Sequence, residues 1–546
     1  MFDYSLESID RIEKIKKLKE AWVIVYANNY HWKMDISEII KNNTNLREVE
    51  EIQENWAESK FKTAWRLMSY KSHGKLAFAK IMDHSGTIQI CFMKDKFKFN
   101  IWVPYSNLLL MSTKDNRFVD YLTIDWEKKS IYKIVEKFVN TWDYIWVIWE
   151  LFLTKHWELT LFVNEFQILS KAIRPLPEKF HWITDIETIY RQRYLDLIMN
   201  DDSFARLKLR SKYIKVLRDF YFENWFTEIE TPVLWNAASW ARAKPFITHH
   251  NDFSEDFYLR ISPETSLKKA TVWRFEKVVE FARDFRNEWS DPSHMQEFTM
   301  IEHYAAWWNY EDNMEFIEKM YDYIFEKIPE LSKVVQVKDK MWNSKRINFQ
   351  TPWQRIDYIR WISRACWIDV SKYSIWDEKI FLKELSLYWI KFEWMKKMGV
   401  PTLIDYLFKK VLRPTITGPA FIYNYPKTMQ PLARQKDSDP SIVEQFQVIV
   451  NGWEICKAYS ELVDPQIQKA NFEAQSWAIE KWDEEATSPD DDFVFAMEYG
   501  MPPQSGFGMW IERTFSLLTG QDNLRDVVLF PLMKSQKNSE IKKEAN

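Results

Sequence analysis

Glycine is nearly missing from this chain, and the shortage constrains the fold more than any other feature of the sequence. Glycine normally makes up about 7% of residues, which is roughly 38 in a chain of 546 residues. Only 9 glycines are present, whereas tryptophan is in excess at 29, and the two types together reach the number expected for glycine alone. Because glycine supplies left-handed backbone and close approach between chain segments, a protein of this length should need it at many turns.

The excess of tryptophan has two explanations. Either the native protein is rich in tryptophan, or most of these residues are glycine in the native protein. Some bacterial lineages read the codon UGA as glycine, and a translation that reads UGA as tryptophan would produce this composition. The positions of the tryptophans can decide between the two.

Local sequence patterns favour glycine at several tryptophans. Asn224-Trp225 separates a helical pattern from a strand pattern, where a left-handed glycine commonly ends a helix. "KHWEL" reads as a hairpin turn, in which glycine is favoured. Another group falls on both faces of any strand and so forms no aromatic face: Trp142, Trp146 and Trp149. We therefore predict that most tryptophans are native glycines and that some, such as one of Trp307 and Trp308, are genuine.

The composition otherwise is that of a soluble globular protein. Hydrophobic residues make up 46% and charged residues 28%, and no apolar run approaches the roughly 18 residues of a membrane span. The charged, helical N-terminus is not of the secretory type. Cys91, Cys366 and Cys456 are far apart and form no zinc or disulfide pattern, which predicts a reducing cytoplasm. The net charge of −4 means that a nucleic-acid partner would need local basic patches.

The order of patterns along the chain predicts its domains. Short alternating runs with turn signals predict a small β-barrel, and the long helices mixed with strands that follow predict an α+β domain. The expected segments are an N-terminal helical extension (1–60), the barrel (61–172), a proline-marked linker (173–200), the α+β domain (201–535) with a helical insertion at about 320–400, and a charged tail (536–546).

The stretch "GFGMWIERTF" presents the tryptophan question most sharply. Gly506, Gly508 and Trp510 are two residues apart, so on a strand they share one face. The first two positions keep that face bare, and the third carries the largest side chain. A glycine at position 510 would complete a bare row.

The stretch "FARDFRNEWSDPSHMQEFTMIEHY" predicts a hairpin that holds a nucleotide. Arg286 and Glu288 share one face of its first strand, His294 lies in the loop, and Phe298 is on the second strand. Arginine offers a planar fork to a phosphate, and phenylalanine offers a face for base stacking. An ordinary charged hairpin is the alternative.

These stretches resemble one family. "FRNE" with "H" and "EFT" resembles motif 2 of the class II aminoacyl-tRNA synthetases, "WFTEIETPVL" resembles motif 1, and "GFGMWIERTF" resembles motif 3. Together with "SKAIRPLPEKFHWITDIETIYRQRYLDLI", "AKPFITHHND", "YLRISPE" and "LRDVVLFP", they resemble the class II lysyl-tRNA synthetases, of class IIb, over nearly the whole chain. Many tryptophans stand where that family carries glycine, including Trp65, Trp142, Trp182, Trp225, Trp240, Trp289 and Trp510.

The resemblance implies a fold and a set of ATP contacts. The fold would be a six-stranded antiparallel sheet flanked by helices, preceded by an OB-fold barrel that binds the anticodon. Arg286 would hold the ATP α-phosphate and the substrate carboxylate, and Arg513 would clamp the γ-phosphate and cover one face of adenine. Phe298 would stack on the other face of adenine, while Glu288 and His294 would contact ATP.

The resemblance also implies a lysine pocket. Lysine brings two ammonium groups, so its pocket needs carboxylates. The residues that match the family's lysine-binding glutamates are Glu264, Glu302 and Glu461. Tyr304 would lie beside Glu302, and Tyr459 would cover the aliphatic stem of the substrate. Trp240 stands at a lysine-contacting glycine, where an indole would obstruct the pocket.

Mg²⁺ would be held with ATP by Glu454 and Gln447, and here the chain departs from the family. Gln447 replaces an expected glutamate, and Lys457 replaces an expected asparagine, so a cation could substitute for part of the metal charge or oppose the α-ammonium of the substrate. Met295 replaces an asparagine and Ser239 a glycine. These departures bear on catalysis rather than on the fold.

The barrel would read tRNA. Phe78 and Gln89 match family positions that contact anticodon bases by stacking and hydrogen bonding, and Glu158 is a third candidate. Phe78 could equally be a core residue of the barrel. Lys71 stands where an arginine is expected.

The leading hypothesis is a cytoplasmic, homodimeric lysine–tRNA ligase with Pro232 at the dimer interface, acting on ATP, L-lysine and tRNA(Lys) without a membrane. Lysine would be activated to lysyl-adenylate and then transferred to tRNA. One alternative is an aspartyl or asparaginyl synthetase of the same subgroup, against which the three glutamates argue. Another is a non-catalytic tRNA-binding or regulatory paralogue, which Lys457 and Gln447 favour.

Overall fold

The computed structural model contains two compact units, residues 1–182 and 183–546, which are described separately. It describes residues 5–27, 33–43, 61–100, 118–154, 158–176, 185–236, 243–338, 344–373, 377–388, 390, 399–479 and 490–535. Several predictions made above fall outside the described residues: those on Trp182, Ser239, Trp240, the "KHW" turn, residues 44–60 and the tail 536–546.

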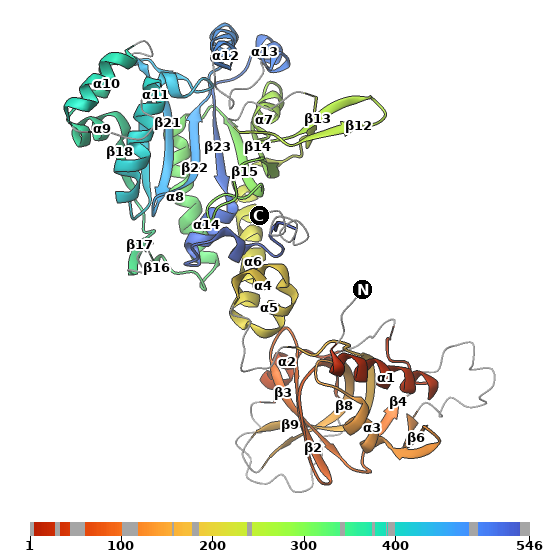
Figure 1. The fold of residues 1–546 in the computed structure, drawn as a ribbon. Coiled ribbons are helices and arrows are strands. Elements are labelled where there is room, and N and C mark those ends of the chain that lie inside the picture. The colour runs from red at the N-terminus through yellow and green to blue at the C-terminus, as the bar shows by residue number, and fades with distance from the viewer. Residues whose placement is uncertain are drawn as a thin grey trace, which may run out of the picture. The chain divides into compact units, whose positions relative to one another are not determined.

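The first unit is a closed β-barrel (Figure 1). Its strands pair in the order β3-β2-β1-β8-β9, and β9 pairs back to β3. The barrel elements are β1 (Phe61–His73), β2 (Leu76–Met82), β3 (Thr87–Met93), α3 (Ile131–Phe138), β8 (Tyr144–Leu153) and β9 (Leu159–Ser170). A five-stranded barrel with a helix between its third and fourth strands confirms the OB-type fold.

Smaller elements complete this unit. Helix α1 contributes Leu18 and Ile15 to the barrel core. The elements are α1 (Leu6–Glu20), α2 (Ile36–Asn42), β4 (Lys98–Asn100), β5 (Phe118–Val119) and the hairpin β6 (Tyr121–Ile124) with β7 (Glu127–Ser130). The helical pattern of the N-terminus therefore becomes a cover for the barrel in its described part.

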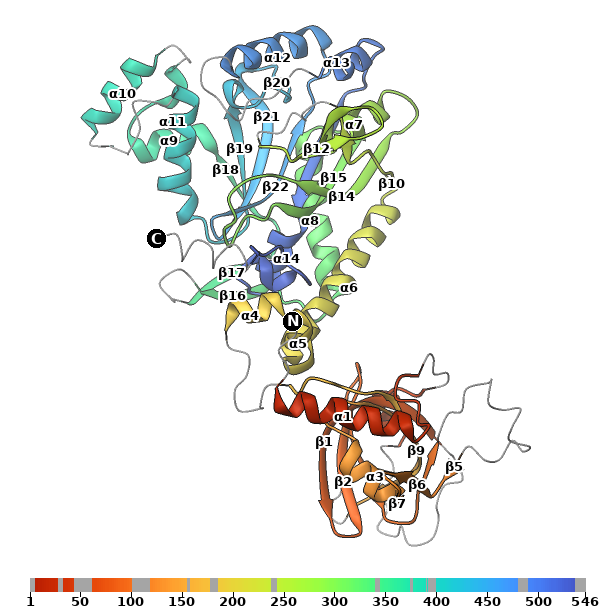
Figure 2. The ribbon, with the colours of Figure 1, turned by 45° about the vertical axis from the view of Figure 1, so that its right-hand side comes forward.

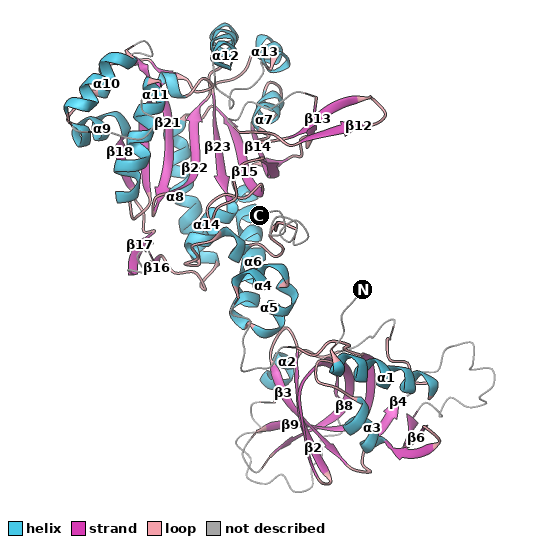
Figure 3. Ribbon diagram, viewed as in Figure 1, coloured by secondary structure: helices cyan, strands magenta, loops and turns pink. Residues whose placement is uncertain are grey.

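The second unit is built on a mixed sheet whose centre is antiparallel (Figure 3). Its antiparallel strands pair in the order β14-β15-β23-β22-β21-β19, with parallel edge strands β10 and β18 and with β20 beside β21. The strands are β10 (Thr227–Glu228), β14 (Lys277–Phe285), β15 (Glu297–Ala306), β18 (Gln354–Asp357), β19 (Ala420–Pro426), β20 (Gln435–Lys436), β21 (Asp439–Val450), β22 (Trp453–Ser460) and β23 (Gln504–Trp510). The predicted antiparallel sheet of α+β class is confirmed.

Three helices pack on one face of this sheet. Tyr213 on α6 (Asp201–Glu223), Met314 on α8 (Tyr310–Lys327) and Phe515 on α14 (Ile511–Leu518) share a core with Phe507 and Met509 of β23. Figure 2 shows α6 leading into β10. Because side chains alternate along a strand, Gly506, Gly508 and Trp510 face the opposite side of the sheet. That side carries the cavity described below.

The remaining elements surround the sheet. They are α4 (Ile186–Arg191), α5 (Arg193–Met199), β11 (Leu234–Trp235), β12 (Ile247–His250), β13 (Glu255–Leu259), α7 (Glu264–Thr271), β16 (Val334–Lys338), β17 (Ser344–Asn348), α9 (Tyr358–Cys366), α10 (Glu378–Leu387), α11 (Val400–Leu407), α12 (Pro465–Ile479) and α13 (Asp491–Glu498). The stretch that was expected to be a helical insertion also contains three strands. In β16 and β17, "VVQVK" and "SKRIN" pair as a short hairpin, and β18 pairs with β19 at the edge of the sheet. Among the described residues, no helix combines the length and the apolar character needed to cross a membrane.

Tryptophan occupies the left-handed position that ends three helices. Trp22 (φ 62°) follows α1, Trp225 (φ 64°) follows α6, and Trp367 (φ 58°) is the C-cap of α9. Glycine dominates this position because a Cβ is strained there. All three indoles are more than two-thirds exposed, so no packing compensates the strain.

Tryptophan also occupies left-handed turn positions. Asp125 (φ 53°) and Trp126 (φ 64°) form the two-residue turn of the β6–β7 hairpin, a geometry for which Asp-Gly is a preferred pair. Trp142 (φ 80°) lies in the turn before β8. Trp307 (φ 67°) is exposed after β15, whereas its neighbour Trp308 packs against the core beside Phe226 and Phe316.

Other tryptophans are accommodated in the interior. Trp353 is buried and donates its indole N–H to the carbonyl of Phe349 at 3.1 Å. Trp65 is buried beneath Lys33 and His84, but its indole N–H has no hydrogen-bond partner among the described residues. The tryptophans are thus a mixed set: some fill the core, and others hold backbone that suits only glycine.

Candidate active site

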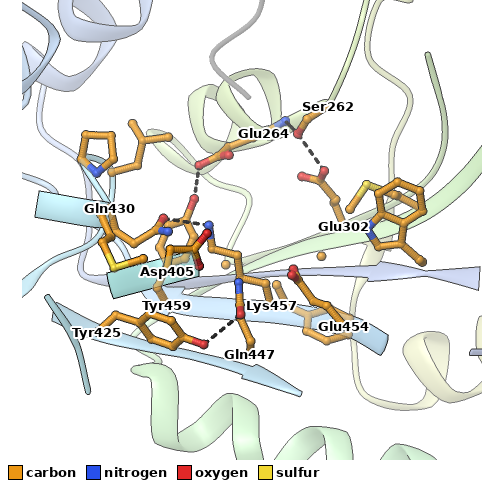
Figure 4. Close-up of a pocket in the computed structure, with 18 of the residues that line it drawn as sticks. Ser262, Glu264, Glu302, Asp405, Tyr425, Gln430, Gln447, Glu454, Lys457 and Tyr459 are labelled. Atoms are coloured by element: carbon orange, nitrogen blue, oxygen red, sulfur yellow. Dashed lines mark hydrogen bonds between the residues drawn. The ribbon is translucent and has the colours of Figure 1, made fainter. Parts of the chain in front are cut away.

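A cavity of about 330 Å³ opens on the face of the central sheet opposite α6, α8 and α14 in the second unit (Figure 4). Strands β15, β21, β22 and β23 form its floor, and helix α7 and the chain around Met429–Leu432 form its walls. Seven of the predicted site residues line it: Glu264, Arg286, Glu302, Tyr304, Gln447, Glu454 and Tyr459. The structure thus brings together seven residues that are widely separated in the sequence.

Of the groups expected to hold ATP, Arg286 lines the cavity, whereas Phe298 and Arg513 are buried against the lining residue Trp510. Arg286 lies 5.2 Å from the ring centre of Phe298, measured from its guanidinium carbon. Arg513 donates to the carbonyl oxygens of Ser293 at 3.1 Å and Glu454 at 3.0 Å. Burial lowers the pKa of Arg513 to about 10, with a nearby carboxylate opposing the shift, so the guanidinium stays charged at neutral pH.

Trp510 lies between the two groups that were expected to enclose adenine. Its indole stacks on Phe298, with ring centroids 3.9 Å apart and planes 14° apart. The guanidinium carbon of Arg513 also lies close to the indole, 4.0 Å from its ring centre. Trp510 itself is only 7% exposed. The indole thus takes the place of a flat aromatic ligand.

Two further predicted ATP contacts, which like Phe298 and Arg513 are not part of the cavity lining, lie in the loop of the hairpin. His294 pairs with Asp291 at 2.8 Å and is half-exposed, and Glu288 is exposed. Met295 lines a different, smaller hollow with Arg283 and Arg525. These residues follow β14 and precede β15, in a loop whose carbonyl oxygens accept from Arg513 and from the backbone of Leu524.

The other end of the cavity is acidic. Ser262 donates to Glu302 at 2.7 Å, and its oxygen also accepts the backbone N–H of Glu264 at 3.1 Å. Tyr304 donates to the second oxygen of Glu302 at 3.3 Å, and Tyr459 donates to Glu264. Burial, together with the nearby carboxylates, raises the pKa of Glu302 well above its ordinary value.

Glu461 lies behind the cavity wall rather than in its lining. It is 1% exposed and pairs with Lys268 of α7. Burial raises the pKa of Glu461 to about 8 although the ammonium of Lys268 opposes the shift. Lys268 also pairs with Glu264 at 2.7 Å. The sequence analysis missed Lys268, although its place four residues after Glu264 on a helix puts both on one face.

Gly506 and Gly508 on β23 allow the acidic residues to pack directly against the strand. A Cβ on Gly506 would lie 2.3 Å from an oxygen of Glu461 and 2.3 Å from the ring of Tyr304. A Cβ on Gly508 would lie 3.0 Å from the terminal methyl of Met300. Gly506 is therefore required by close packing, which is the second of the two uses of glycine.

Glu454 is the carboxylate expected to hold a metal with ATP, and Asp405 also lines the cavity (Figure 4). Glu454 and Gln447 both line the cavity, and the amide oxygen of Gln447 accepts from Tyr425 at 2.8 Å. Gln447 stands directly opposite Lys457 on neighbouring strands, and Lys457 donates to Gln430 at 2.7 Å. This donor set fits an ion that is ligated mainly by phosphate oxygens and water, and it is too poor in carboxylates for a closed protein site.

The predicted anticodon residues lie together on the outer face of the barrel. Phe78 points away from the buried Ala77 and Ala79, so it is not a core residue. Gln89 donates to Thr160 at 2.9 Å. Lys80 lies opposite Gln89 and pairs with Glu158 at 3.4 Å. Lys71 is exposed on the adjacent strand, paired in register with Phe78. Lys80 is a member of this group that the sequence analysis did not name.

Comparison with known proteins identifies the family. Residues 185–534 match the family described as tRNA synthetases class II (D, K and N). This chain belongs to that family. Among similar class II synthetases, the lysine–tRNA ligase of Carboxydothermus hydrogenoformans is 35% identical over 96% of this chain and 97% of its own length. Those of Aquifex aeolicus (37% identical, covering 88% of this chain and 74% of the relative) and Thermotoga maritima (34%, 97% and 96%) are also similar.

Proposed function

We propose that this class II synthetase is a lysine–tRNA ligase. The observation that carries the proposal is the acidic end of the cavity, where Glu264 and Glu302 face the space and Glu461 lies directly behind it. The substrate lysine has two ammonium groups, and buried cations need carboxylate partners. The names of the full-length relatives support the same substrate.

The reaction proceeds in two steps, and the residues act by position and charge. The lysine carboxylate is ionised at neutral pH, so it attacks the ATP α-phosphorus without a general base, and pyrophosphate leaves. Arg286 lies between the acidic end and Phe298, where it can hold both the carboxylate and the α-phosphate in line. The terminal ribose hydroxyl of tRNA(Lys) then attacks the acyl carbonyl, and AMP leaves.

Mg²⁺ would accompany ATP. When bound, it would neutralise phosphate charge and shape the phosphate chain. Glu454 and Gln447 would hold it from the protein side, and Lys457 adds a fixed positive charge beside them. His294, Glu288 and Arg513 would contact the remaining parts of ATP from the hairpin and from α14.

We further propose that the tryptophans in left-handed backbone, and Trp510, are glycine in the native protein. The support is geometric: Trp22, Trp126, Trp142, Trp225, Trp307 and Trp367 hold backbone that disfavours a Cβ, and Trp510 fills the space between Phe298 and Arg513. Trp308 and Trp353 remain tryptophan because they are packed. We call the protein with glycine at every UGA codon the glycine-decoded chain and the printed sequence the all-tryptophan chain.

The partners follow from the same assignment. The outer face of the barrel that holds Phe78, Gln89 and Glu158 would bind the tRNA(Lys) anticodon by stacking and hydrogen bonding. The protein would work as a homodimer in the cytoplasm, with Pro232 at the interface. Trp240 in the all-tryptophan chain would obstruct the lysine site.

One experiment separates the candidate functions. Amino-acid-dependent ATP–pyrophosphate exchange by the glycine-decoded chain should occur with lysine and not with aspartate or asparagine. Exchange with aspartate or asparagine would instead identify another member of the subgroup. A folded dimer without exchange would support the non-catalytic paralogue, which the Gln447 and Lys457 pair favours.

A codon test addresses the tryptophans directly. UGA codons at positions 225, 307 and 510, together with peptide masses of glycine in native material, are expected. UGG codons at those positions would overturn the recoding proposal.

A further inference from the structure

Lys268 is a buried cation inside the acidic cluster, and none of the roles given above uses it. Its side chain is 2% exposed, and its ammonium pairs with Glu264 at 2.7 Å and with Glu461. The rings of Tyr304, Tyr459 and Phe493 lie around it, with centres 5.8, 5.4 and 5.6 Å from the nitrogen. Carboxylates and aromatic faces are the groups that would surround a substrate ammonium.

We propose that Lys268 is a built-in counter-ion that sets the charge of the lysine pocket, and so is a specificity-determining positioning residue. This role rests on the proposed function, and the charges of the cluster support it. Glu264, Glu302 and Glu461 carry three negative charges when ionised, and Lys268 leaves two. Substrate lysine brings two ammonium groups, while its carboxylate is matched by Arg286. The fixed ammonium therefore makes the pocket neutral with lysine and incompletely matched with a mono-ammonium amino acid.

Packing of α7 fixes the position of the Lys268 ammonium, unlike that of a free ion. Glu264 and Lys268 are one turn apart on α7, and Leu267 anchors the helix against Val278 and Tyr304. The two carboxylates raise the pKa of Lys268 against the opposing effect of burial, so the ammonium keeps its proton. Burial tends to raise the pKa of Glu264, but Lys268 and the hydroxyl of Tyr459 outweigh it and keep the carboxylate ionised.

Removal of the ammonium would leave two buried carboxylates close together without a counter-ion. Without the ammonium, burial raises the pKa of Glu264, so that Glu264 also holds a proton in the free protein, in addition to those on Glu302 and Glu461. An arriving substrate ammonium would have to displace this extra proton. Charged and titratable groups face the site from several elements. They are Glu264 and Lys268 on α7, Asp284 on β14, Arg286 just after β14, Glu302 and Tyr304 on β15, Asp405 on α11, Lys457 and Tyr459 on β22, and Glu461 just beyond β22. Loss of Lys268 should therefore increase the number of protons that are released when lysine binds, and it should also lower the affinity for lysine.

The test compares Lys268→Met with Lys269→Met in the glycine-decoded chain. Lys269 is the next residue and pairs with the exposed Asp492 outside the pocket. Calorimetric titration with L-lysine in two buffers of different ionisation enthalpy gives both affinity and protons released. Lys268→Met should bind lysine at least about tenfold more weakly at pH 7, which is about 1.4 kcal/mol. It should also release more protons than the parent and regain affinity as pH rises.

The controls make the outcome decisive. Lys269→Met should match the parent, and Lys268→Arg, which keeps the charge, should keep the parent proton count. If Lys268→Met does not fold, Lys268→Gln tests the same loss of charge while keeping a hydrogen-bond donor. An unchanged proton count in the neutral variants would overturn the proposal even if affinity falls. Failure of the parent to bind lysine at all would instead count against the proposed function.

Discussion

The indole of Trp510 stacks on the ring of Phe298, with centroids 3.9 Å apart. The guanidinium carbon of Arg513 lies 4.0 Å from the centre of the same indole. Phe298 and Arg513 are the residues that would enclose adenine in an enzyme of this family. The stack in the all-tryptophan chain therefore reproduces the arrangement of a bound base with a side chain of the protein. Residue 510 decides whether that slot is open or filled.

Trp510→Gly in the all-tryptophan chain should strengthen ATP binding. Stacking of a base on an aromatic side chain is worth about 1–3 kcal/mol, so we expect a gain of about tenfold to hundredfold in affinity, measured by calorimetry. Trp367→Gly is the matched control because its indole is exposed at the end of α9. Equal ATP affinity in the parent and in Trp510→Gly would show that the slot is not the adenine site.

Trp225→Gly should stabilise the all-tryptophan chain. The residue has φ 64° and an exposed indole, and left-handed backbone costs a residue with a Cβ about 1–2 kcal/mol. Trp308→Gly should destabilise the chain by about 2 kcal/mol or more, because its ring packs against Phe226 and Phe316. Thermal unfolding of the three proteins measures both effects. A lower melting temperature for Trp225→Gly would contradict the strain argument.

Periodicity and motifs predicted the parts of the fold that local sequence determines. The two-residue spacing in "GFGMWIERTF" predicted that Gly506, Gly508 and Trp510 share one face of a strand, and in the structure all three line the cavity. The end of α6 at Trp225 was predicted from the helical pattern, and its positive φ is found in the structure. These features depend on neighbours within a few residues, which a sequence displays directly.

Contacts between distant segments could not be predicted in the same way. The pairing of Lys268 with Glu461 joins residues far apart in the chain, because α7 packs against β14 and β15 of the sheet to which the β22 segment belongs. The same holds for Lys80 and Glu158 on the barrel. The hairpin of β16 and β17 was missed because each strand has only five residues and lies between longer helical patterns, although Val335 and Val337 of β16 are buried in the core.

Gly506→Ala should abolish lysine binding by the glycine-decoded chain. The added methyl would lie 2.3 Å from both Glu461 and Tyr304, and neither buried group has room to move away. Gly418→Ala is the control, since its nearest contact would be an ordinary 3.8 Å. Isothermal titration with lysine, after circular dichroism has shown that both variants are folded, measures the loss. Parent-like affinity in Gly506→Ala would mean that the acidic cluster is looser than the structure indicates.

Lysine binding should release protons at pH 7. Burial raises the pKa of Glu461 to about 8 and that of Glu302 well above its usual range, so both hold protons in the free protein and ionise beside the substrate ammonium groups. Because the folded pKa of Glu461 exceeds its unfolded value of about 4.3, the lysine-free protein should lose stability as pH rises from about 4.3 to about 8. Lysine affinity should rise over the upper part of this range. Identical binding heats in phosphate and Tris buffers would rule out proton release.

Lys457 should reduce the dependence of ATP binding on Mg²⁺. Lys457 and Gln447 are direct partners on neighbouring strands, and relative to the glutamate and asparagine expected from the family they add two units of positive charge, the charge of one Mg²⁺. In the glycine-decoded chain, Lys457→Asn should therefore weaken ATP binding in the presence of a chelator by about tenfold, because a charge-assisted contact is worth roughly 1.5–3 kcal/mol. The double variant Gln447→Glu with Lys457→Asn should regain affinity only when Mg²⁺ is added. Lys410→Asn is the control, because Lys410 is exposed after α11 and lies outside the cavity lining, and it should leave ATP affinity unchanged with and without Mg²⁺. If Lys457→Asn binds ATP as tightly as the parent in the presence of the chelator, the ammonium of Lys457 does not contact the phosphates.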